Sequence, residues 1–243
     1  MKKYPLNEKM ELINELNEIN GKSWAEFLLH WNCSAWSHLF STFAEYQVLL
    51  LDDNNKLMAY GHTIPIYWDQ KLIDIPDNLK ILIENGVESI NKGINPNILL
   101  ALAAVVSPEY KNNGLSTEIV KAMKKLSLEK NYASLIVPVR PTLKSKYPLI
   151  PIKNYACWKR EDGLAFDPWL RVHDKLGGEI LKTAEVSMII TGKVKEWEEW
   201  SKIKIPESGK YIIEGALNPV EIDCEKDIGT YTDPCIWVKY SNK

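Results

Sequence analysis

The sequence has few of the features that mark metal centres, disulfide scaffolds or membrane spans. Its four cysteines, Cys33, Cys157, Cys224 and Cys235, are widely scattered and form no CxxC pair. This spacing indicates neither a zinc site nor a disulfide framework, and it favours reduced thiols in a cytoplasmic protein. The four histidines have no cysteine or carboxylate at a recognisable ligand spacing, so we expect no bound metal.

Long hydrophobic runs are also missing. No stretch approaches about 18 unbroken apolar residues, so we expect neither a membrane span nor a membrane partner. The N-terminus begins with two lysines and soon becomes amphipathic and acidic, unlike a signal peptide. These absences add to the expectation of a cytoplasmic protein.

The sequence lacks an excess of basic side chains. It contains 30 Lys and Arg residues against 32 Asp and Glu residues, a formal net charge of −2. Because proteins that bind phosphate backbones usually carry a clustered basic excess, we do not expect a nucleic-acid partner. The 243 residues, 45% of them hydrophobic, contain no Gly/Ser linker and no repeat. We therefore predict a single domain over 1–243, with 193–243 as a C-terminal extension.

The residues that are present alternate between helical and strand-like patterns. Apolar positions three and four apart predict helices over 7–19, 23–43, 80–92, 115–130, 168–176 and 194–200. Ser23 and Glu26 have the form of a capping box for the second helix, and Asp167 is expected to cap the fifth. Apolar runs predict strands over 46–52, 56–68, 95–107, 132–141, 186–192, 210–215 and 235–240, the first two forming a hairpin.

The middle of the chain predicts an α/β core. The run 98–106 is apolar on both faces, as expected of a central strand covered on both sides. A helix of about 15 residues separates it from the next strand, which favours parallel pairing of the two. Pro65 suggests that its strand ends there or runs at a sheet edge. The tail from 209 to 243 leaves three alternatives: it completes the sheet, closes over a groove, or joins a second subunit in a homodimer.

The loop between that strand and that helix could bind an anion. Asn112, Asn113 and Gly114 can adopt positive φ, and the helix that follows offers unpaired N–H donors and the hydroxyls of Ser116 and Thr117. This combination suits phosphate groups. The alternative is a tight turn in which Ser116 or Thr117 caps the helix.

This segment resembles the GCN5-related N-acetyltransferase (GNAT) family. The family signature is Gln or Arg, two variable residues, Gly, one variable residue, then Gly or Ala, opening the helix after the fourth strand. The matching residues are Lys111, Gly114 and Ser116. The resemblance implies a mixed, twisted central sheet flanked by helices, whose central strands splay apart to hold the thioester of acetyl-CoA or another acyl-CoA.

The resemblance also implies which residues hold the acyl-CoA. The backbone of Ala104, Val105 and Val106 would pair with the pantetheine arm, and Val106 would polarise the thioester carbonyl. Main-chain amides would hold the pyrophosphate over Lys111, Asn112, Asn113, Gly114, Leu115, Ser116 and Thr117. In the family a tyrosine on a later helix protonates the departing thiolate, and His173 stands near that position here. We expect His173 to be the acid or base, because imidazole exchanges protons near neutral pH; the alternative is a structural helix histidine.

Other polar residues are candidates for the acceptor side. The segment after the fifth strand leaves the edge of the sheet where α/β proteins place ligands, so Arg140 could pair with a substrate carboxylate, while Thr142 and Tyr147 could donate hydrogen bonds. His62 lies on the third strand, which by the resemblance faces the acceptor groove, and Trp68 could line the same groove. For each of these residues, a surface or core role is the alternative.

Three functions remain open at this stage. The first is acyl transfer from acyl-CoA to a small-molecule amine by direct attack. The second comes from a resemblance to GNAT-like domains of polyketide synthase loading modules, which implies malonyl-CoA decarboxylation and transfer to a carrier-protein thiol, with Thr142 and His173 as the catalytic pair. The third is an acyl-CoA-binding protein without catalysis.

Overall fold

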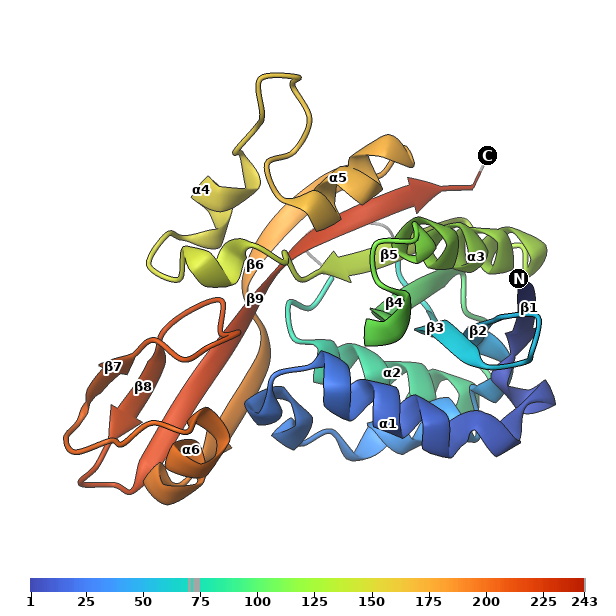
Figure 1. Ribbon diagram of the computed structural model, residues 1–243. Coiled ribbons are helices and arrows are strands. Elements are labelled where there is room, and N and C mark those ends of the chain that lie inside the picture. The colour runs from blue at the N-terminus through green and yellow to red at the C-terminus, as the bar shows by residue number, and fades with distance from the viewer. Residues whose placement is uncertain (70, 72–74, 243) are drawn as a thin grey trace.

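The computed structural model describes residues 1–69, 71 and 75–242. Over these residues, strands form one mixed sheet flanked by helices (Figure 1). The strands are β1 (Lys2–Pro5), β2 (Val48–Leu51), β3 (Leu57–Ile66), β4 (Ile98–Val106), β5 (Ser134–Val139), β6 (Glu179–Gly192), β7 (Gly209–Tyr211), β8 (Val220–Asp223) and β9 (Ile228–Ser241). The α-helices are α1 (Ile13–Ser23), α2 (Leu79–Asn91), α3 (Leu115–Glu129), α4 (Ile152–Ala156), α5 (Pro168–Lys175) and α6 (Val194–Ser201). The 3₁₀ helices are η1 (Leu6–Glu8), η2 (Met10–Leu12), η3 (Glu26–His30), η4 (Ser34–Phe40), η5 (Ala44–Tyr46), η7 (Pro108–Tyr110) and η8 (Lys144–Lys146).

The strand order confirms the predicted α/β architecture with a mixed sheet. The order is β1-β2-β3-β4-β5-β9-β8-β7, and β6 pairs with β9 outside this path. β4 and β5 are parallel, as the crossover helix α3 predicted, and the neighbouring pairs β3–β4 and β5–β9 are antiparallel. The tail completes the sheet, because β9 runs beside β5 from the pair Ser134–Ser241 to the pair Val139–Ile236.

Two layers of helices cover the sheet. On one face, α3 packs its buried side chains, including Ile119 and Met123, against Leu99 and Ala101 of β4. On the other face, α2 and η4 pack against Ile98 and Leu100, and α1 packs beside them. Figure 1 shows α3 and α5 on one side of the sheet and α1 and α2 on the other. β4 is therefore covered on both faces, as its apolar sequence predicted.

The predicted helix over 23–43 is wrong. Ser23 is the last residue of α1 rather than a helix cap, and its hydroxyl oxygen is buried without a hydrogen-bond partner in the described structure. The chain then forms η3, η4 and η5, with extended residues between η3 and η4 and a turn over 41–43 between η4 and η5. Its apolar side chains pack into different cores, because Phe27 lies against Trp197 whereas Leu39 lies on the central sheet. One straight helix presents a single apolar stripe and could not reach both.

Most other elements follow the prediction, with shifted ends. α1 covers Ile13–Ser23 instead of 7–19, while α2, α3, α5 and α6 begin and end within a few residues of the predicted ranges. The carboxylate of Asp167 caps α5 by accepting from the N–H groups of Trp169 and Leu170. Pro65 lies inside β3, but β2 pairs only with Leu57–Gly61, so the Pro65 end of β3 is a sheet edge on that side.

The C-terminal part of the chain builds a small core of its own. β7, β8, α6 and the first half of β9 enclose Trp197, Val220, Ile222 and Tyr231, and Phe27 of η3 joins them. This packing fixes η3 against the C-terminal extension (Figure 1). It thereby brings residues 23–28 and the loop around Gly215 to the same end of the molecule, where both border the cavity described below.

Candidate functional site

The central strands β4 and β5 separate soon after they meet. They form only two residue pairs, Leu99–Leu135 and Leu100–Ile136. At this point β4 contains a bulge, since His62 and Thr63 of β3 pair with Ala103 and Ala101, leaving Leu102 without an opposite residue. A bulge bends its strand and increases its twist, which directs the rest of β4 away from β5.

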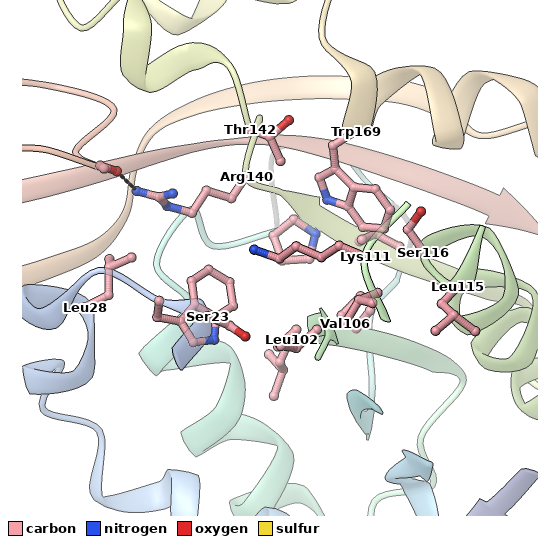
Figure 2. A pocket seen from close by; sticks show the side chains of 18 of the residues that line it. Ser23, Leu28, Leu102, Val106, Lys111, Leu115, Ser116, Arg140, Thr142 and Trp169 are labelled. Atoms are coloured by element: carbon pink, nitrogen blue, oxygen red, sulfur yellow. Dashed lines mark hydrogen bonds between the residues drawn. The ribbon is translucent and has the colours of Figure 1, made fainter. Parts of the chain in front are cut away.

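A cavity of about 550 Å³ occupies the opening between the two strands. Figure 2 shows Leu102 and Val106 of β4 on one side and Arg140, Thr142 and Trp169 on another. The described residues that line it are Ser23, Trp24, Ala25, Leu28, Ala101, Leu102, Ala103, Ala104, Val105, Val106, Tyr110, Lys111, Asn112, Gly114, Leu115, Ser116, Met123, Val137, Pro138, Arg140, Thr142, Ser145, Trp169 and Gly215. Pro138, which has no N–H, lies where β5 has already left β4, so no hydrogen bond to β4 is lost.

The loop before α3 has the backbone of an anion site. Asn112 and Gly114 adopt φ of 66° and 73°, and no side chain caps α3. Within the described structure, the N–H groups from Asn112 to Ser116 have no acceptor. The first hydrogen bond at the start of the helix is from Thr117 N–H to the Gly114 carbonyl. The positive end of the helix dipole adds to these free donors. The alternative of a capped turn is therefore wrong.

Backbone N–H groups of β4 also face the cavity. Ser107 donates its N–H to the Met58 carbonyl of the neighbouring chain segment at 2.9 Å. Because successive N–H groups point to opposite sides of a strand, those of Val106 and Ala104 point away from β3, toward the opening. A thioester or amide lying along β4 could accept hydrogen bonds from them.

Ten of the sequence-predicted site residues lie on the cavity wall. They are Ala104, Val105, Val106, Lys111, Asn112, Gly114, Leu115, Ser116, Arg140 and Thr142. Figure 2 shows the Lys111 side chain directed into the cavity. Asn113 and Thr117 belong to the same loop and helix start but are not among the lining residues.

The structure places His173 outside the cavity wall. Its side chain is 1% exposed, and Nδ1 lies 2.7 Å from the hydroxyl oxygen of Tyr240. The ring of Trp169, which does line the cavity, packs edge-on against the imidazole with 4.6 Å between ring centres. Burial lowers the pKa of His173 to about 4. The imidazole is thus neutral at pH 7 and shielded, and its position gives no support to the expected proton-transfer role.

His62, Trp68 and Tyr147 also lie outside the cavity lining. His62 is buried, its Nδ1 lies 2.9 Å from the amide oxygen of Gln47, and burial lowers its pKa to about 3. The indole N–H of Trp68 donates to the Lys71 carbonyl at 3.0 Å. Tyr147 packs in an aromatic cluster with Tyr155, Trp158 and Phe166. In each case the contacts are those of a structural residue.

Arg140 joins β5 to the C-terminal extension. Its Nε donates to both carboxylate oxygens of Asp233, at 3.0 and 3.1 Å, and Nη2 donates to the Gly215 carbonyl at 2.7 Å. Asp233 is 1% exposed and also accepts from the hydroxyl of Tyr231. The guanidinium therefore lies in the cavity wall while its counter-ion is buried behind it.

Thr142 is held by the buried carboxylate of Asp167. Besides capping α5, Asp167 accepts from Leu143 N–H at 2.8 Å and from the Tyr155 hydroxyl at 2.9 Å. The Thr142 hydroxyl lies 3.5 Å from the same carboxylate. One buried acid therefore fixes both the loop that carries Thr142 and the start of the helix that carries Trp169.

No sequence pattern indicates one wall of the cavity. Ser23, Trp24, Ala25 and Leu28 come from the N-terminal segment, and Gly215 comes from the C-terminal extension. They meet through long-range packing: a Cβ on Gly215 would lie 2.9 Å from the Cβ of Ala25. No spacing or motif links positions 190 residues apart, so only the structure could find them. Among the described residues, no group of three or more side chains could hold a metal ion, and no helix is long and apolar enough to cross a membrane.

No family model matches the chain. It is 31% identical over 245 residues to the arginine N-acetyltransferase avaD of Aspergillus versicolor, covering 88% of this chain and 84% of that protein. The structure resembles the loading GNATL domain of CurA from Lyngbya majuscula, with a TM-score of 0.65, 18% identity and coverage of 96% and 94% of the two chains. It also resembles mosquito arylalkylamine N-acetyltransferase like 5b, with a TM-score of 0.52, 9% identity and 99% of both chains covered.

The curated relative, the splayed strands and the uncapped helix lead to the same conclusion. The mixed twisted sheet predicted from the sequence is also the fold of these neighbours. The chain belongs to the GCN5-related N-acetyltransferase superfamily of acyl-CoA-dependent N-acyltransferases.

Proposed function

We propose that the protein transfers the acetyl group of acetyl-CoA to the amine of a small acceptor. The observation that carries the proposal is the opening between β4 and β5, which ends at the free N–H groups of residues 112–116. The relative avaD is by name an arginine N-acetyltransferase, which supports a small molecule with an amine or a guanidine as the acceptor.

The loop before α3 would bind the diphosphate of acetyl-CoA. The free main-chain donors and the helix dipole supply a site that depends on backbone rather than on side-chain identity. Lys111, whose side chain points into the cavity, would add a positive charge beside the phosphates (Figure 2). This explains how Lys111 and Ser116 can replace the residues that the family signature prefers.

The opening between the strands would hold the thioester. The pantetheine arm would lie along Ala104, Val105 and Val106, and a main-chain N–H of β4 would donate to the thioester oxygen. As the acceptor nitrogen attacks the carbonyl carbon, negative charge grows on that oxygen, and a fixed donor stabilises it. Holding both reactants in one cavity supplies the rest of the rate increase.

The described cavity wall contains no carboxylate and no imidazole. An ammonium acceptor would therefore lose its first proton to water before it attacks. The second proton would leave through water in the open cavity as the CoA thiolate departs. The rate should then rise with pH until the amine of the acceptor is fully deprotonated, because only the free amine is a nucleophile.

The carrier-protein alternative needs Thr142 and His173 together at the thioester. The separation of His173 from the cavity wall by the Trp169 ring weighs against it. The likeness to the CurA loading domain is at 18% identity and concerns the fold. The amine acceptor is therefore the function that we propose.

The test combines binding and turnover. CoA should raise the melting temperature of the protein, and acetyl-CoA with a panel of small amines should release free CoA thiol. Lys111→Ala should weaken CoA binding by about 10-fold, as expected for the loss of one charge-assisted contact. The matched control is Lys121→Ala, an exposed lysine of α3 that is outside the cavity lining and pairs with Glu118. Failure of CoA to protect the protein, or equal effects of the two variants, would refute the proposed site.

A further inference from the structure

The charges on the cavity wall indicate what kind of acceptor it takes. In the described wall, Lys111 and Arg140 are the charged side chains, and both are cationic. Lys111 belongs to the loop that would face the diphosphate of acetyl-CoA. Arg140 lies at the other end, on the side of Leu28 (Figure 2), where it donates to the Gly215 carbonyl.

The guanidinium of Arg140 is held in place by hydrogen bonds, but one of its nitrogens makes none. Nε is bonded to Asp233, and Nη2 to the Gly215 carbonyl and, at 3.5 Å, to the Tyr231 hydroxyl. Nη1 has no acceptor within the described structure, and it is not among the fully enclosed polar atoms that lack a partner. The Arg140 side chain is 20% exposed and lines the cavity. Nη1 is thus a fixed, accessible donor.

Asp233 is not available to bind a cationic group of the acceptor. It is 1% exposed, and both of its carboxylate oxygens already accept from Arg140. It lies behind the wall and neutralises part of the guanidinium charge, but it does not reach the cavity. An acceptor entering this end therefore meets a cationic donor and no anion.

We propose that the acceptor carries a carboxylate as well as its amine, and that Arg140 Nη1 binds this carboxylate. The inference rests on the proposed function. Because the acetyl group of the donor is uncharged, the carboxylate has to come with the acceptor. A fixed guanidinium suits this role because its orientation is set before the acceptor binds.

Matched pairs of acceptors test the inference on the unmodified protein. The pairs are leucine and leucinamide, tryptophan and tryptamine, and arginine and agmatine; one member of each pair has the carboxylate and the other lacks it. A hydrogen bond to a charged group changes affinity by about 10- to 100-fold. We expect kcat/KM, measured by release of CoA from acetyl-CoA, to be higher for the acid member by about this factor. The amine of leucinamide is less basic than that of leucine, so intrinsic reactivity favours the opposite result in this pair.

A double variant links the preference to Arg140. Arg140→Gln alone would leave Asp233 buried without its partner and could unfold the protein. Arg140→Gln combined with Asp233→Asn removes both charges. In this variant the advantage of the acid member of each pair should disappear, while CoA still raises the melting temperature.

The outcomes separate this inference from the proposed function. Equal kcat/KM within the pairs of the wild type, or a preference that survives in the double variant, would overturn the carboxylate inference while N-acetylation stands. Acetylation of no amine at all, with CoA still bound, would overturn both. If malonyl-CoA binds at least 10-fold more tightly than acetyl-CoA and the double variant abolishes this difference, the carboxylate belongs to the acyl group and the inference fails.

Discussion

His173 and Tyr240 form a buried hydrogen bond, with 2.7 Å between imidazole Nδ1 and the phenol oxygen. The bond joins α5 to β9 outside the cavity lining, and the Trp169 ring lies against the imidazole. Burial raises the pKa of the Tyr240 hydroxyl and lowers that of His173. Both groups therefore stay uncharged at neutral pH, and we infer that the pair contributes to the stability of the fold.

The first prediction concerns the catalytic role of His173. In His173→Gln, the amide can still bond to Tyr240, so kcat/KM should stay within about threefold of the wild type while the free energy of unfolding falls by about 1–3 kcal/mol. Thiol release and urea unfolding measure the two quantities. A loss of more than 100-fold in kcat at unchanged KM, in a variant that remains folded, would mean that the imidazole reaches the reacting atoms after all.

The second prediction is a loss of stability in mild acid. His62 and His173 have folded-state pKa values of about 3 and about 4, below the ordinary value of 6.5. Above pH 6.5 both histidines are neutral in the folded and the unfolded chain. Below it, the unfolded chain binds protons that the folded protein cannot, so stability falls as the pH falls. The loss should be on the order of 2 kcal/mol per histidine between pH 6.5 and pH 5.

Urea unfolding at pH 7.5 and at pH 5 tests this prediction. His62→Gln and His173→Gln should each remove about one proton from the pH dependence of the free energy of unfolding. The explanation is wrong if the wild type is equally stable at both pH values.

The loop end of the cavity could be predicted from the sequence because its signals are local. The apolar strand, the loop with Asn112 and Gly114, and α3 follow one another within about thirty residues, and each has a pattern of its own. Positive φ is expected at Gly114, which has no Cβ, and at Asn112, whose short polar side chain tolerates it. The bulge at Leu102, which separates β4 from β5, gave no such signal, because it depends on pairing with β3.

The wall formed by residues 23–28 and Gly215 could not be predicted, because its parts meet only through long-range packing. Ala25 and Gly215 meet only because Phe27 packs beside Trp197 in the C-terminal core. The apolar residues of 23–43 have helical spacing, yet they serve two separate cores, and long-range packing overrides local preference. The imidazole of His173 and its place near the family's tyrosine predict an acid or base. Neither feature indicates the Trp169 ring that packs beside it. Arg140 was found because it follows a strand end, where α/β proteins place ligands.

The third prediction concerns Asp167 as the support of the cavity wall. Asp167→Ala removes the acceptor of five donors, including Leu143 N–H and the Tyr155 hydroxyl. Leaving such buried donors unpaired should cost about 3–5 kcal/mol of stability. Asp162→Ala is the matched control, since this exposed carboxylate accepts a single backbone bond, from Leu164; its cost should be about 1 kcal/mol or less. Similar unfolding midpoints for the two variants would contradict this account of Asp167.

The fourth prediction separates backbone strain from cofactor binding. Gly114 and Gly93 both have positive φ, 73° and 66°, and a Cβ at either position would meet no atom within 4 Å. Gly114→Ala and Gly93→Ala should therefore each reduce stability by about 1–2 kcal/mol through strain alone.

Gly114 lies in the loop whose N–H groups would hold the diphosphate, whereas Gly93 follows α2 outside the cavity lining. Gly114→Ala should also weaken CoA binding measured by calorimetry, because relief of the strain would turn the loop donors away from the phosphates. Gly93→Ala should bind CoA as the wild type does, and an equal loss of affinity in both variants would show that strain, not the loop, decides binding.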